Sequence, residues 1–164
     1  ILTPMIGITN SVVSVAAYNY GARKKKRITD TFRWGRIYGS VMMTFAAFCF
    51  LLFPEAIKAP FHPTEEMLTD GIPIFRIVGF TFVFSPLSMI NCSLFQGLGN
   101  GGYSLVVPVA RPLMIRVPLA YLFALSGALS LGWYCWPVSE ICSDLISLAL
   151  LRRMYKKVLC AQKT

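Results

Sequence analysis

The chain has 164 residues, 55% of them hydrophobic and 14% charged, and its mean hydropathy is +0.60. A soluble domain carries about a quarter charged residues, so this composition excludes an ordinary soluble domain and predicts a protein whose solvent is lipid. The net charge of +9 comes from 16 basic and 7 acidic residues, and most basic residues fall in two clusters, Arg23 to Arg36 and Arg152 to Lys163, which excludes a general basic coating.

The first predicted span covers about residues 1–20 and is the most polar of the apolar segments. Its polar side chains would be costly against lipid, so we expect them, Asn10 included, to face other helices or an aqueous cavity. The basic run Arg23–Arg27 follows. Lys and Arg mark the cytoplasmic loops of membrane proteins, so we interpret this run as a short cytoplasmic loop. A nucleic-acid partner is not expected, because such a surface needs a soluble basic domain.

The second span covers about residues 34–53 and the third about residues 74–95, with an acidic segment between them. In that segment Thr64 is a plausible N-cap with acids in the first turn, which predicts a short interfacial helix on the outer face. Pro86 removes a backbone donor inside the third span. A bend is therefore expected near Phe82.

A glycine-rich stretch at 96–102 predicts a turn before the fourth span, about residues 103–124. Three prolines, Pro108, Pro112 and Pro118, exclude a straight, regular helix there. The fifth span covers about residues 132–151, and a basic tail follows at 152–164. Each span has the roughly 20 apolar residues that cross a bilayer as a helix. The fold class is therefore an all-α membrane protein with five transmembrane helices.

The loop charges agree with five spans, because alternate loops must lie on opposite sides of the membrane. Both basic clusters then fall on one side and the acidic segment falls on the other. We expect a multi-pass membrane protein with a cytoplasmic C-terminus; the resemblance described below implies the bacterial inner membrane.

Four charged residues lie inside the predicted spans: Arg111 and Arg116 in the fourth, Glu140 and Asp144 in the fifth. Each costs about 2.5 to 3.5 kcal/mol at a helix centre, so they should be paired or face water. In an antiparallel hairpin Arg111 lies level with Asp144, and Arg116 with Glu140. Residues five apart differ by roughly 140° on a regular helix, so we expect one direct pair unless the prolines rotate the helix. Either a structural ion pair or a substrate or proton pathway would explain these charges.

Polar residues near the inner end of the third span form a second candidate site. Asn91 and Gln96 are candidates to line a cavity, and hydrogen bonds between helices are the alternative. No catalytic residues are indicated, because no nucleophile–base set, metal spacing or phosphate loop is present. The only histidine, His62, is expected in a loop, and the five cysteines are scattered without a Cys-x-x-Cys pair. No metal site or cofactor is expected.

Several motifs, in this order, resemble the C-terminal lobe of transporters of the multidrug and toxic compound extrusion (MATE) family. The most specific is Tyr18-Asn19-Tyr20-Gly21-Ala22, which is followed by basic residues. The others are Pro4-x-x-Gly7, Gln96-Gly97-Leu98-Gly99-Asn100, Pro118-Leu119-Ala120-Tyr121 after Arg111, and Pro137-Val138-Ser139-Glu140.

The resemblance implies twelve helices in two six-helix lobes, with alternating access to a cavity between them. This chain would be a partial C-terminal lobe of five helices. Its expected partners are membrane lipid, the N-terminal lobe of the same protein, and small organic cations or drugs exported against Na⁺ or H⁺. Because Ile1 opens inside an apolar run, we expect a piece of a longer chain. The alternatives are a flippase for lipid-linked oligosaccharides of the same superfamily and a truncated, non-transporting fragment. The third span has no Asp or Glu, which leaves the coupling ion open.

Overall fold

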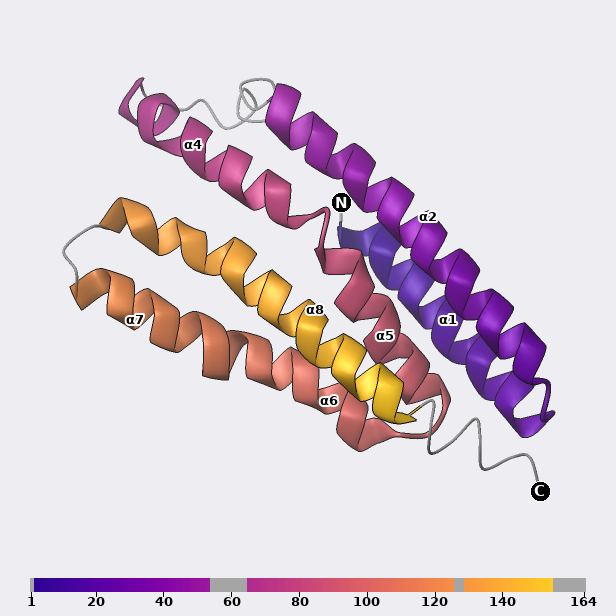
Figure 1. Cartoon of the computed structure of the whole chain (residues 1–164). Coiled ribbons are helices and arrows are strands. Elements are labelled where there is room, and N and C mark those ends of the chain that lie inside the picture. The colour runs from indigo at the N-terminus through magenta and orange to yellow at the C-terminus, as the bar shows by residue number, and fades with distance from the viewer. Residues whose placement is uncertain (1, 54–64, 126–128, 155–164) are drawn as a thin grey trace.

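The computed structural model describes residues 2–53, 65–125 and 129–154, and within these ranges every element is helical (Figure 1). The all-α prediction is confirmed for this part of the chain. The elements are α1 (Leu2–Gly21), α2 (Lys25–Leu52), α4 (Glu65–Thr81), α5 (Ser85–Gly97), α6 (Gly101–Val109), η2 (Ala110–Arg116), α7 (Val117–Leu125), η3 (Leu129–Tyr134) and α8 (Cys135–Met154).

Successive helical runs return on one another, so that the chain is a bundle of antiparallel rods (Figure 1). Four runs of the described part are long and apolar enough to cross a membrane: Lys25–Leu52, Pro73–Gly97, Gly101–Leu125 and Gly132–Met154. The fifth rod is α1, the most polar one, which packs against α2 and α5. The α1–α2 turn, the α5–α6 turn and the end of α8 lie at the same end of the bundle, so the described basic residues of both clusters share one end (Figure 1).

The first basic cluster is mostly helical, and the prediction of a basic loop is wrong for most of its length. Only residues 22–24 connect α1 to α2, because α2 already begins at Lys25. Arg23 adopts a left-handed conformation with φ of 54°, while the Lys24 amide donates to the Asn19 carbonyl over 2.9 Å and the Arg23 amide to Tyr20 over 3.1 Å. These two bonds form a Schellman motif, which satisfies the last carbonyls of α1. The end of the Tyr18–Ala22 motif therefore builds a tight reversal.

The acidic segment does not form a separate interfacial helix where the structure describes it. Residues 65–71 are the first turns of α4, which runs on through Pro73 to Thr81. Thr64 and His62 lie outside the described residues, as does the tail from 155 onward.

Proline shapes the third and fourth spans as their sequences predict. Helix α4 ends at Thr81 and α5 begins at Ser85, so the break lies at Phe82, where the bend was expected (Figure 1). In the fourth span the hydrogen-bond register changes instead. Ala110–Arg116 is a π-helix, closed by a bond from the Val117 amide to the Pro112 carbonyl, five residues back.

Close approach of backbones holds α1, α2 and α5 together. A methyl group built on Gly35 would lie 2.6 Å from Val12 Cγ2, and one on Gly97 would lie 2.8 Å from the Val13 carbonyl oxygen. Gly35 and Gly39 form a Gly-x-x-x-Gly pair on α2. Such pairs let helices approach closely in membranes, where packing and not water drives association.

Candidate functional site

A cavity of about 510 Å³ lies beside the α4–α5 break. Its wall comes from the ends of both helices at that break, from η2 and from the start of α8, with Thr9 of α1 completing it. The cavity contains the charged residues that the sequence places inside the membrane, and only Asp144 of those four is absent from the lining. This cavity is therefore the candidate functional site.

Arg111 joins three parts of the bundle through its three side-chain nitrogens. Nη1 donates to Glu140 Oε1 over 3.1 Å, Nε donates to Ser143 Oγ over 3.3 Å, and Nη2 donates to Ser88 Oγ. Glu140 and Ser143 lie on α8 and Ser88 lies on α5. Each guanidinium nitrogen thus donates to a protein group, and three of the five N–H donors are used, which is the behaviour of a structural arginine.

Arg116 is held more loosely. Its Nη2 lies 3.7 Å from Glu140 Oε1 and 3.4 Å from Ser139 Oγ, both longer than a usual hydrogen bond. Its Nε is buried and has no hydrogen-bond partner in the described part of the chain. The guanidinium carbon lies 4.0 Å from the centroid of the Trp136 ring, in a cation–π contact. Arg116 therefore keeps donor capacity that the described residues do not use.

Glu140 receives both arginines on the same oxygen, Oε1, and its side chain is only 6% exposed. Arg111, which the hairpin count places level with Asp144, forms its ion pair with Glu140, and Arg116, placed level with Glu140, lies 3.7 Å from it. The wider turn of the π-helix brings residues five apart closer to one face than a regular helix does, so Arg111 and Arg116 point toward the same partner.

Asp144 is bound to α5 instead. The Ser88 amide donates to Asp144 Oδ1 over 3.0 Å. Ser88 lies in the first turn of α5, where the helix dipole is positive and favours a carboxylate. Asp144 is thereby held at the start of α5, next to the break at residues 82–84.

Asn91 takes part in a bond between helices and does not line the cavity. Its Nδ2 donates to Ser147 Oγ over 2.8 Å, and the residue is fully buried between α5 and α8. This is the alternative that the sequence left open. Asn10 and Gln96 are exposed on α1 and α5 and line neither this cavity nor the groove between α1 and α2, so their role in a pathway stays a prediction.

A stripe of serines on α8 was missed by the sequence reasoning. Ser139, Ser143 and Ser147 recur every four residues, are buried, and each contacts Arg116, Arg111 or Asn91. That spacing places them on one helix face next to Glu140 and Asp144. The i, i+4 repeat of small polar residues in an apolar helix was the available signal.

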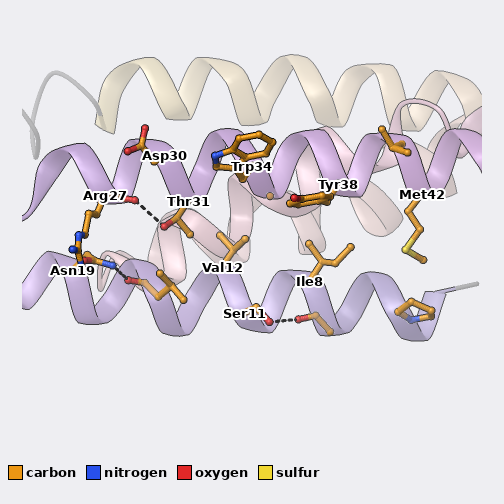
Figure 2. A pocket seen from close by; sticks show the side chains of 15 residues that line it. Ile8, Ser11, Val12, Asn19, Arg27, Asp30, Thr31, Trp34, Tyr38 and Met42 are labelled. Atoms are coloured by element: carbon orange, nitrogen blue, oxygen red, sulfur yellow. Dashed lines mark hydrogen bonds between the residues drawn. The ribbon is translucent and has the colours of Figure 1, made fainter.

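A larger groove of about 1040 Å³ lies between α1 and α2 (Figure 2). Trp34 and Tyr38 stack there at 5.7 Å between ring centroids, and Arg27 and Asp30 lie toward one end. Ser11 Oγ and Asn19 Nδ2 donate to carbonyls of their own helix, and the buried Asn19 Oδ1 has no partner among the described residues. The smaller cavity remains the better site because it holds buried charges with unused hydrogen-bonding atoms.

The remaining motif residues form turns. Gly99 has φ of 76°, the Asn100 amide donates to the Phe95 carbonyl over 2.9 Å, and the Gly99 amide donates to Gln96 over 3.0 Å. This is a second Schellman motif, at the end of α5. Within the described residues no group of three or more His, Cys, Asp or Glu side chains is arranged to hold a metal ion.

Comparisons with known proteins found a family model and solved structures of the same fold. The family model MatE matches residues 1–122. The chain is similar to the inward-facing conformation of a multidrug resistance MATE family transporter of the MOP superfamily, with a TM-score of 0.83 and 21% identity over 99% of this chain and 38% of that one. It is equally similar, with a TM-score of 0.83 and 23% identity over 98% of this chain and 36% of the other, to a MOP superfamily transporter from Pyrococcus furiosus, for which a binding pocket of reverse polarity is said to suggest a different function. No curated protein matches the sequence significantly.

Proposed function

Because the chain belongs to the MATE family of membrane transporters, we propose that it forms the C-terminal lobe of an efflux antiporter. The antiporter exports small organic molecules by alternating access, in exchange for Na⁺ or H⁺. The chain spans between a third and two fifths of the length of the two solved structures, so the remainder of such a transporter would supply the sixth helix of this lobe and the N-terminal lobe. The basic ends of α2 and α8 lie on the cytoplasmic side.

The observation that carries this proposal is the charged cavity at the helix break. Ionised groups inside a membrane are expensive and mark pathways for ions or substrates. Secondary transporters place their sites where helices are interrupted, because free backbone groups there can face a ligand. Here Arg111, Arg116 and Glu140 meet beside the interrupted α4–α5 span.

The test is accumulation of fluorescent compounds by cells that express the full-length protein. The host lacks its own efflux pumps, and the panel holds a cationic dye, ethidium, and an anionic one, fluorescein. We expect lower accumulation of at least one dye, abolished by collapse of either the Na⁺ or the H⁺ gradient. Unchanged accumulation of both dyes, with the protein present in the membrane, would refute efflux.

A further inference from the structure

We propose that the Arg116 side of the cavity binds an anionic group, the carboxylate or phosphate of a small organic molecule. This inference rests on the proposed function and names the class of its cargo. It replaces the organic cation implied by the family resemblance with an anion or a zwitterion.

The charge balance of the cavity favours an anion. Among the described residues that line it, the charged ones are Arg111, Arg116 and Glu140, which sum to one positive charge. The nearby Asp144 is outside the lining, and its Oδ1 accepts a hydrogen bond from the Ser88 amide near the positive end of α5. The charged side chains that face the cavity therefore attract an entering anion more strongly than a cation.

The two arginines have different tasks. Arg111 uses all three nitrogens and three of its five N–H donors on Glu140, Ser143 and Ser88, which fixes its position. Arg116 has only contacts of 3.4 and 3.7 Å, both through Nη2, and its side chain is 25% exposed. A planar guanidinium group with free donors is suited to bind a carboxylate or phosphate through two parallel hydrogen bonds. Arg116 is therefore the ligand-binding member of the pair.

The surroundings of Arg116 suit an organic anion better than a bare ion. The Trp136 ring lies against the guanidinium group at 4.0 Å and, with Phe82 and Met89, gives the cavity an apolar wall. Ser85 supplies a further hydroxyl in the lining. The volume of about 510 Å³ is in the range of sites for small molecules. The cavity thus offers the Arg116 guanidinium group for an anionic group and an apolar wall for the rest of an organic ligand.

A cation fits this site poorly. Both guanidinium groups lie within 3.7 Å of Glu140 Oε1, so a cation at that oxygen would be repelled from two sides. Glu140 Oε2, which has no partner in the described part of the chain, is itself buried. Glu140 therefore serves to position the arginines.

The experiment measures binding by the purified full-length protein and needs no transport. Radiolabelled benzoate and benzyltrimethylammonium, which have similar shape and opposite charge, are compared by equilibrium dialysis. We expect benzoate to bind more tightly and Arg116→Gln to weaken it by about tenfold or more, the worth of a hydrogen-bonded charge. Arg116→Lys should retain part of the affinity. Arg76→Gln is the matched control. Arg76 is exposed on α4 and does not line the cavity, and its substitution changes the net charge by the same amount.

The result that overturns the proposal is preferential binding of benzyltrimethylammonium, or loss of benzoate binding by the same factor in Arg76→Gln as in Arg116→Gln. The first result would show that the rest of the protein sets the charge preference for the ligand, and the second that binding is unspecific.

Repeating the assay in nanodiscs with and without phosphatidylglycerol distinguishes a lipid headgroup from a soluble anion. If phosphatidylglycerol competes with benzoate, and Arg116→Gln abolishes that competition, the site binds a lipid headgroup. If phosphatidylglycerol does not compete, the site binds a soluble anion. If efflux fails while benzoate binds as described, the anion site stands and the transport proposal falls.

Discussion

Replacing Arg111 with glutamine tests whether one side chain holds α5, η2 and α8 together. The substitution leaves Glu140 buried, with Arg116 alone at 3.7 Å. Removing one member of a buried ion pair costs about 3 to 5 kcal/mol, because the other charge stays buried without its partner. The two serine contacts add little, since hydrogen bonds between membrane helices average about 0.6 kcal/mol. We therefore expect the free energy of unfolding to fall by about 3 to 5 kcal/mol.

Arg116→Gln is the matched comparison. Its contacts of 3.4 and 3.7 Å exceed normal hydrogen-bond lengths, so we expect a loss of less than about 1.5 kcal/mol. Unfolding of the full-length protein by sodium dodecyl sulfate in mixed micelles, followed by circular dichroism, measures both values. The double variant Arg111→Gln with Glu140→Gln should recover at least half of the loss, because it removes the orphaned charge. Equal losses in the two single variants, or strictly additive losses in the double variant, would refute this division of roles.

Two further outcomes follow from the packing and the topology. Gly97→Ala should cost about 1 to 3 kcal/mol, because the new methyl group would lie 2.8 Å from a backbone oxygen. Gly39→Ala should change stability by less than about 1 kcal/mol, since its nearest neighbour, at 3.2 Å, is the flexible end of a methionine; equal effects in the same unfolding assay would contradict the close approach of α1 and α5. In a cysteine-free background, an impermeant maleimide should label Lys24→Cys and Arg153→Cys from one side of the membrane and Leu125→Cys from the other. Labelling of the first two from opposite sides would refute the topology.

The helices could be predicted from the sequence, because the length of an apolar segment and the position of a proline determine where a helix forms and where it breaks. The break near Phe82 was found from Pro86 alone, since a missing amide affects the preceding turn whatever surrounds it. The structure of the first basic cluster was predicted wrongly because it is not set by local preferences. Three successive cations are unfavourable at a helix N-terminus, yet α2 begins at Lys25. The reversal at Arg23, which needs only three connecting residues, leaves no room for a longer loop.

The charged residues of the site were identifiable, but their partners were not. Depth along two antiparallel helices can be counted from the sequence, whereas the direction of a side chain depends on the hydrogen-bond register. The π-helix at Ala110–Arg116 changes that direction, so that both arginines reach Glu140 where a regular helix would present only one. The partner of Asp144 could not be predicted from the sequence either, because that partner is the backbone amide of Ser88 at the start of α5.

The proline content of the fourth span and the charge of the cavity are linked. A regular helix would present Arg111 and Arg116 in directions roughly 140° apart, and only one could reach Glu140. The wider turn of η2 presents both, so that one carboxylate secures Arg111 strongly and Arg116 weakly. A site that keeps a cation available inside a membrane needs such partial neutralisation, because an unpaired arginine would be too costly and a fully paired one would be inert. The π-helix therefore supplies the geometric condition for a ligand-binding arginine at Arg116.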